Sequence, residues 1–156
     1  MQLGRVLLRL LPIVVVACAG IGPVERGELV SDPAWKLRMP GTEELAHFSD
    51  ERRMTLDGPV DAYDGFAFGT QASDLEVFAF YDQELRRLGW RREPLVSPST
   101  VELRIWGWCK PRILFRLATK DQPRAFRPEF YRGRSYVTVF DARLRGRDTS
   151  FPCPMT

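Results

Sequence analysis

The sequence has only one histidine, His47, and its three cysteines lie far apart. Zinc sites and redox-active cysteine pairs need closely spaced Cys and His residues, so neither kind of centre is expected. The glycines from Gly65 to Gly69 lack the spacing of a P-loop or a dinucleotide-binding motif. No glycine-rich nucleophile elbow is present either. We therefore expect no metal and no cofactor.

A long hydrophobic run is also missing. A helix that spans a bilayer needs about 20 apolar residues, but the run from Leu10 to Ala17 is short and contains Pro12. Arg5 and Arg9 precede this run, and small residues follow it. This order of charged, apolar and small segments is typical of a secretory signal peptide. We predict that residues 1–17 form such a peptide and that the protein is exported.

The predicted signal peptide ends in the segment Val15-Val16-Ala17-Cys18. This segment resembles the lipobox of bacterial lipoproteins, although Val15 stands where leucine is favoured. The resemblance implies that Cys18 receives a diacylglycerol and becomes the first residue of the mature protein. The protein would then be anchored to the extracytoplasmic side of a membrane. Two alternatives remain: cleavage that releases a soluble protein starting at Gly20, and an uncleaved leader that serves as the anchor.

The other two cysteines are Cys109 and Cys153. If lipid occupies Cys18, these two are left as a pair, and an oxidising compartment would let them form a disulfide. Such a bridge would hold the C-terminal tail against the turn after Trp108. Two buried free thiols are the alternative.

The chain behind Cys18 divides into a flexible tether, residues 18–33, and a single domain, residues 34–156. Glycine, proline and charged residues in the first segment favour a tether, and a chain of 156 residues fits one domain. Charge is uneven, with fourteen acidic and five basic residues over 25–84 but sixteen basic and six acidic over 85–156. Two solvated surfaces of opposite sign explain this, and a basic surface for an anionic partner is the alternative.

The segment from Ser73 to Trp90 predicts an amphipathic helix. Ser73 and Glu76 have the spacing of a capping box, and Gly89 suits the C-terminal end. The apolar side chains that share one face of this helix are Val77, Phe78, Tyr81, Leu85 and Leu88.

Alternating apolar residues predict strands around Phe66 and Phe68 and over residues 101–108, 112–119 and 134–145. A short strand is also predicted over residues 90–93, and residues 43–48 are predicted as a strand, with a helical turn as the alternative. We predict an α+β fold: an antiparallel sheet of about four to five strands with one long amphipathic helix packed on one face. Trp106 and Trp108 are predicted on the opposite face. The residues predicted to face the helix are Phe66, Phe68, Leu103, Ile105, Ile113, Phe115, Leu117, Tyr136 and Phe140.

The passage from helix to strand, with Phe80-Tyr81, Leu85 and Gly89-Trp90, resembles a segment of small exported bacterial proteins of unassigned function. This resemblance covers about twenty residues and implies an α+β sandwich, but no activity.

Few residues suggest catalysis. A catalytic triad or a Cys–His dyad would have to use His47, and Cys109 is expected to form a disulfide. Asp57, Asp61 and Asp64 lie close together, but their spacing differs from that of a calcium loop. Residues of turns explain them.

The segment 124–134 alternates arginines with aromatic residues and is the predicted binding surface. Its candidate residues are Arg124, Phe126, Arg127, Phe130, Tyr131, Arg132 and Arg134. On a membrane-tethered domain such a surface suits anionic lipid headgroups or an acidic envelope protein, and no nucleic acid is expected. The alternative is a loop whose aromatic side chains pack under the sheet.

The sequence therefore predicts a non-catalytic envelope lipoprotein that binds another protein or an envelope component. An exported hydrolase-like enzyme with an unidentified carboxylate site is the alternative, and an accessory subunit of a larger complex is a third possibility.

Overall fold

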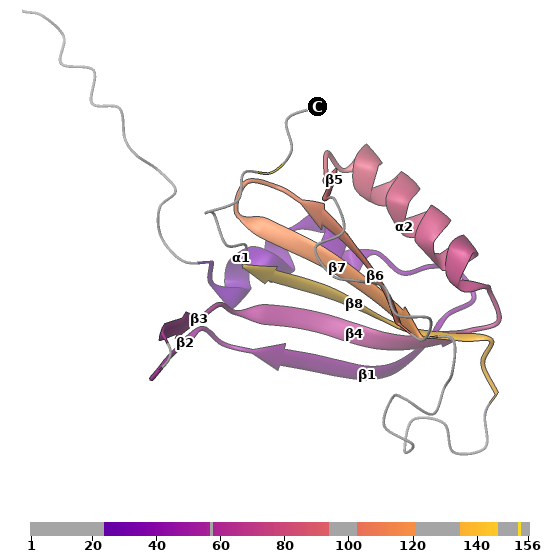
Figure 1. The fold of residues 1–156 in the computed structure, drawn as a ribbon, viewed down its shortest axis with the longest axis horizontal. Helices are drawn as coiled ribbons and strands as arrows, with labels where there is room; N and C mark the ends of the chain where they lie inside the picture. Colours follow the sequence, from indigo (N-terminus) through magenta and orange to yellow (C-terminus); the bar gives the residue numbers. More distant parts are fainter. Residues whose placement is uncertain (1–23, 57, 94–102, 121–134, 147–152, 154–156) are drawn as a thin grey trace, which may run out of the picture.

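The computed structural model describes residues 24–56, 58–93, 103–120, 135–146 and 153 (Figure 1). In chain order its elements are α1 (Arg26–Ser31), the 3-10 helix η1 (Pro33–Lys36), β1 (Glu43–Asp50), β2 (Arg53–Thr55), β3 (Gly58–Val60), β4 (Tyr63–Thr70), α2 (Asp74–Arg87), β5 (Arg91–Glu93), β6 (Leu103–Cys109), β7 (Ile113–Lys120) and β8 (Thr138–Gly146). None of the helices in this part of the chain is long and apolar enough to cross a bilayer.

Six strands form one antiparallel sheet in the order β1-β4-β8-β7-β6-β5, and β2 and β3 form a separate hairpin. The predicted α+β class and antiparallel sheet are confirmed, but the predicted number of four to five strands is too low. Both edge strands, β1 and β5, overlap segments predicted as short strands, 43–48 and 90–93. β5 has only three residues, and β1 is half-exposed and polar, so neither has the clear alternation of a buried strand.

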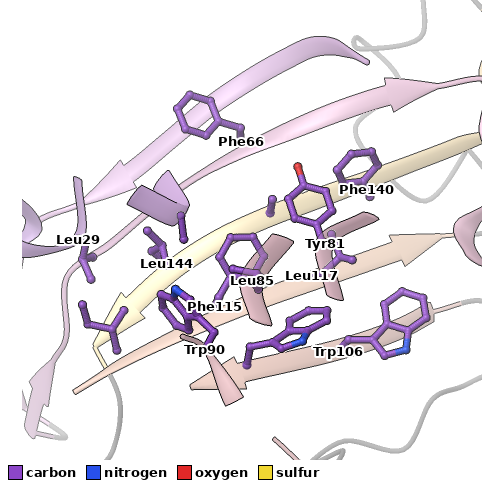
Figure 2. Close-up of a cluster of buried hydrophobic side chains, with 14 of the residues drawn as sticks. Leu29, Phe66, Tyr81, Leu85, Trp90, Trp106, Phe115, Leu117, Phe140 and Leu144 are labelled. Atoms are coloured by element: carbon purple, nitrogen blue, oxygen red, sulfur yellow. The ribbon is translucent and has the colours of Figure 1, made fainter. Parts of the chain in front are cut away.

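Helix α2 has fourteen residues and lies across one face of the sheet (Figure 1). Ser73 and Glu76 form the capping box at its N-terminus, and Gly89 follows it with φ of 80°. The helix buries Val77, Tyr81 and Leu85 against the sheet. Figure 2 shows the resulting core, in which Tyr81 contacts Phe115 and Phe140 with ring centroids 5.6 and 5.8 Å apart.

Strand β6 presents the opposite face to the helix from the one predicted. Trp106 and Trp108 lie under α2, where Ile105 was predicted, and the Phe78 ring stacks on both indoles with ring centroids 5.0 and 5.9 Å apart. The Trp108 Nε1–H donates to Asp82 Oδ1 on α2 at 2.9 Å. Both faces of this strand carry apolar residues, so alternation alone does not choose between them. The two indoles bury more area, and that of Trp108 also has a hydrogen-bond acceptor on the helix.

Tyr136 precedes β8, and it also differs from its predicted position among the residues that face the helix. Its ring covers Gly69 and its hydroxyl donates to Glu43 at 2.6 Å. Phe66 and Phe68 face α2 on β4, and successive residues of a strand point to opposite faces. Tyr136 therefore lies on the face of the sheet away from the helix.

The predicted flexible tether, residues 18–33, is wrong for residues 24–33. Val24 is buried, and the short helix α1 buries Leu29 in the core that α2 also covers. Asp32 then caps η1 by accepting a hydrogen bond from the Ala34 N–H, and Pro33 takes the first position. Polar composition suggested a linker, but a single apolar residue per turn is enough to fix these two helices to the sheet.

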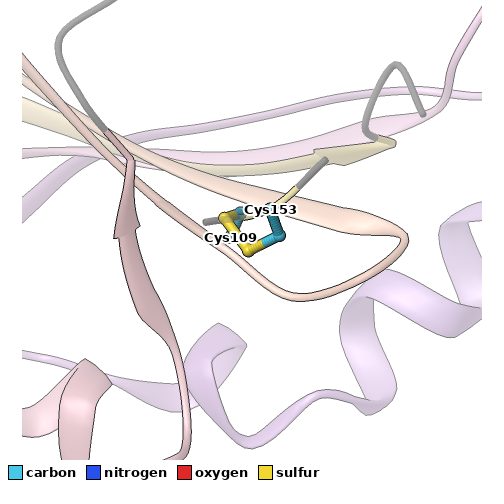
Figure 3. Close-up of a disulfide and its surroundings, with 2 residues drawn as sticks. All are labelled: Cys109 and Cys153. Atoms are coloured by element: carbon cyan, nitrogen blue, oxygen red, sulfur yellow. A yellow bond between two sulfur atoms is a disulfide. The ribbon is translucent and has the colours of Figure 1, made fainter. Parts of the chain in front are cut away.

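A disulfide joins Cys109, the last residue of β6, to Cys153 in the C-terminal segment, with the Cα atoms 5.9 Å apart (Figure 3). Cys109 is completely buried. The bridge predicted from the cysteine count is therefore present, and it excludes the two free thiols that were the alternative.

Candidate functional site

A buried carboxylate lies at the end of the sheet where β4 begins. The Asp64 side chain has no solvent exposure, and three side chains donate to it. Arg26 Nε donates to Oδ2 at 2.7 Å, while Trp35 Nε1 at 2.8 Å and His47 Nε2 at 2.9 Å both contact Oδ1. We call these four residues the Asp64 cluster.

The donors of the Asp64 cluster come from three different elements. Arg26 is the first residue of α1, Trp35 lies in η1, and His47 lies on the edge strand β1. Phe66 on β4 supports two of them, because the His47 ring stacks on it at 4.5 Å and the Trp35 ring meets its edge at 5.5 Å. One carboxylate thus fixes the N-terminal helices and the edge strand to the sheet.

The electrostatics of the cluster favour an ionised Asp64. Burial by itself would raise the pKa of this carboxyl, but hydrogen bonds from Trp35, Arg26 and His47 outweigh burial and hold the pKa below its ordinary value. Asp64 is therefore ionised near neutral pH, where it accepts hydrogen bonds and has no proton to donate. It is therefore an anchor for cations and N–H groups, and it lacks the raised pKa of a general acid.

This lowered pKa predicts how stability depends on pH. Because the folded-state pKa of Asp64 lies below the unfolded value of about 3.9, its contribution is complete above that value and is lost as pH falls through the folded pKa. We expect the free energy of unfolding to fall below about pH 4, and Asp64→Asn to flatten this fall. Urea unfolding at several pH values measures both. An equally steep fall in the variant would show that other carboxyls cause it.

Arg38 closes the cluster on the side of α2. Its guanidinium carbon lies 3.8 Å from the centroid of the Phe66 ring and 5.3 Å from that of Phe68. The same guanidinium donates to the carbonyl oxygens of Trp35 and Leu37 at 2.8 and 2.9 Å. These contacts hold the cation over the aromatic rings, beside the Asp64 cluster.

Next to the cluster is a cavity of about 10 Å³, roughly the space of one water molecule. Its lining includes Trp35, Arg38, Asp64 and Phe66. A site of this size does not admit a substrate, and the buried Asp64 has no surface on which to receive one. The geometry therefore supports a structural cluster.

Comparison with models of protein families, with curated proteins and with solved structures finds no match to this chain.

His47, Cys109 and Asp61, which the sequence did not favour as catalytic or metal-binding groups, make structural contacts. The His47 Nε2 atom is hydrogen-bonded to Asp64 Oδ1, and Cys109 forms the disulfide with Cys153. Asp61 packs against Gly146, where an added Cβ would lie 2.7 Å from the Asp61 carboxyl carbon. The part of the chain that the structure describes contains no group of three His, Cys, Asp or Glu side chains placed to hold a metal ion.

Two predicted sites lie outside the described residues. These are the lipidation site Cys18 and the aromatic and basic segment with Arg124, Phe126, Arg127, Phe130, Tyr131, Arg132 and Arg134. The structure brings together a set that the sequence did not suggest, Arg26, Trp35 and Arg38 around Asp64. The sequence Asp32-Pro33, an N-cap followed by proline at the first helical position, is the one local signal that marks this region as helical.

The same end of the sheet carries exposed apolar side chains on the β2–β3 hairpin. Met54 is 72% exposed, and Leu56 in the turn is fully exposed. Val60 on β3 is also exposed. Among the described strands, β2 and β3 pair only with each other, in the register Arg53 to Val60 and Met54 to Pro59.

Proposed function

We propose that the protein is a lipid-anchored, non-catalytic binding domain of the bacterial cell envelope. The observation that carries this proposal is the pairing of the cysteines. The chain has three, and Cys109 and Cys153 are joined to each other. Since a cysteine forms one disulfide, Cys18 is left over, and it is the cysteine of the lipobox-like segment.

The disulfide also supports the proposed location. Structural disulfides persist in oxidising compartments and are rare in the cytosol. A chain with a secretory leader and a buried structural bridge fits the extracytoplasmic side of a membrane. Both features favour export, and they rest on different parts of the sequence.

The Asp64 cluster gives the proposed anchor a defined point of attachment. Arg26 and Trp35 bind Asp64 and Val24 is buried, so the chain is fixed to the sheet from Val24 onward. Val24 is only six residues from Cys18. An extended segment of six residues spans at most about 20 Å. A lipid on Cys18 would therefore hold the domain close to the bilayer.

The proposed binding surface remains the segment from Arg124 to Arg134. Arginines interleaved with Phe126, Phe130 and Tyr131 suit anionic headgroups or an acidic envelope protein at short range from the membrane. The alternative of an exported hydrolase gains nothing from Asp64, because three donors saturate this carboxylate and its pKa is lowered, not raised.

Metabolic labelling with a fatty acid tests the anchor. We expect the wild-type protein to incorporate the label and to sediment with membranes. Cys18→Ser should lose at least about nine-tenths of the label because the hydroxyl cannot form the thioether. Ala19→Ser is the matched control and should behave like the wild type. Equal labelling of Cys18→Ser and wild type, or an unlabelled soluble product starting at Gly20, would contradict the proposal.

A further inference from the structure

The β2–β3 hairpin presents apolar side chains that nothing in the described structure covers. Large hydrophobic side chains are exposed at five described positions, and Met54, Leu56 and Val60 are three of these. The other two, Leu75 and Val137, lie at the opposite end of the sheet. Arg53 pairs with Val60 and Met54 pairs with Pro59, so Met54 and Val60 lie on opposite faces of the hairpin. The two most exposed of the three side chains, Met54 and Leu56, lie in β2 and in the turn that follows it, and large exposed apolar side chains of this kind can mark an interaction site.

The hairpin lies beside the point where the chain enters the domain. Two ion pairs connect the start of α1 to the base of the hairpin. Glu25 Oε1 is 4.0 Å from Arg52 Nη1, and Arg26 Nη1 is 3.6 Å from Glu51 Oε1. Figure 1 shows α1 and the hairpin at the same end of the sheet. The first described residues of the chain, Val24 to Arg26, therefore lie at the base of the hairpin.

Distances along the chain limit which end of the domain approaches the lipid. Six residues from Val24 to Cys18 reach at most about 20 Å. Strand β4 has eight residues, about 26 Å at 3.3 Å per residue. It runs from the hairpin end to Thr70, whose carbonyl accepts the Val137 N–H. The hairpin end is therefore closer to a lipid on Cys18 than the Val137 end.

We infer that the β2–β3 hairpin inserts Met54 and Leu56 into the headgroup region of the membrane that holds the lipid anchor. This inference rests on the proposed lipidation of Cys18. Side chains of this type enter the boundary between headgroups and acyl chains, where apolar burial is favourable. The short tether supplies the second requirement, because it keeps the hairpin within reach of the bilayer.

Charges around the hairpin do not favour a particular headgroup. Acidic and basic residues at its base pair with each other: Glu25 with Arg52, Glu51 with Arg26, and Asp50 with Arg53 at 3.0 Å. These three acidic and three basic residues carry no net charge, so they do not attract anionic lipid in particular. Insertion should therefore occur equally in zwitterionic vesicles, unlike binding through the segment 124–134.

A fluorescent label on a single added cysteine tests the inference. In the lipidated full-length protein the three native cysteines are occupied, so Leu56→Cys adds the only free thiol. Val137→Cys is the matched control, because Val137 is also an exposed apolar residue (55%) at the other end of β4. Each variant carries an environment-sensitive dye, is checked for lipid by intact mass, and is placed in phosphatidylcholine vesicles with and without a nitroxide-labelled lipid.

We expect the dye at position 56 to shift to the blue by about 10 nm or more and to lose at least half its intensity to the nitroxide lipid, as interfacial side chains do. The dye at position 137 should do neither. Equal spectra at both positions in lipidated protein would overturn the inference and leave the lipid anchor intact. Protection of position 56 only in native membranes would also overturn it, since a protein would then cover the hairpin. Absence of lipid on Cys18 would overturn both proposals.

Discussion

Replacing Asp64 by asparagine is expected to lower the free energy of unfolding by about 3 kcal/mol, because removing one partner of a buried charged pair leaves the others unpaired. An asparagine has one acceptor oxygen, whereas Asp64 accepts from Arg26, Trp35 and His47. The NH2 group of the asparagine, which is itself a donor, would therefore face at least one of these three donors. We expect the lower end of the usual range, because Arg26 and His47 are 34% and 39% exposed and can bind water instead. Urea unfolding at pH 7 measures the change.

Asp50→Asn is the control for this substitution. Asp50 lies at the end of β1 near Asp64, but it pairs with an arginine that is 61% exposed. Surface ion pairs contribute less than about 1 kcal/mol, so this variant should unfold almost as the wild type does. If both variants lost the same small amount, Asp64 would not be the anchor that the geometry indicates.

The loss of stability in Asp64→Asn should be largest at helix α1. Its link to the sheet through Arg26 is removed in Asp64→Asn, while α2 keeps its own capping box. We therefore expect hydrogen exchange in α1 and η1 to accelerate more than in α2. A uniform acceleration would mean that Asp64 stabilises the domain as a whole and not the N-terminal helices in particular.

Removing the disulfide is expected to have the largest effect on stability. The two cysteines are 44 positions apart, and the chain-entropy model gives about 4 kcal/mol for a loop of about 45 residues. We expect the Cys109→Ser, Cys153→Ser double variant to melt about 10–20 °C below the wild type, given the usual change in Tm per kcal/mol. Thermal unfolding followed by circular dichroism measures it.

Treatment of the wild type with a reductant provides a check on this result. The reduced protein should melt near the double variant, and the double variant itself should not respond to reductant. A double variant that melts within about 3 °C of the wild type, less than 1 kcal/mol, would contradict a stabilising role of the bridge.

Local signals in the sequence predicted several elements correctly. Ser73 and Glu76 form the capping box, and Gly89 follows the helix as its spacing indicated. These features depend on neighbours within a few residues, so the sequence contains all that decides them. The disulfide could also be predicted from the sequence, because only three cysteines were available to pair.

Features that depend on distant residues could not be predicted in this way. The prediction of which face of β6 meets α2 was wrong. Trp106 and Ile105 lie on opposite faces of the strand and both are apolar, so the choice between the faces depends on contacts with Phe78 and Asp82 on the helix. The Asp64 cluster combines residues separated by up to 38 positions. Asp64 resembled a turn residue because its donors are contributed by elements that the sequence did not connect to β4.

Intact mass of the protein extracted from native membranes, with and without reductant, tests the central proposal most directly. We predict a chain that starts at Cys18, carries the mass of a diacylglycerol, and gains about two daltons on reduction of the single disulfide. An unmodified chain that starts at Gly20, or one that retains residues 1–17, would contradict the lipid anchor and with it the membrane-facing hairpin.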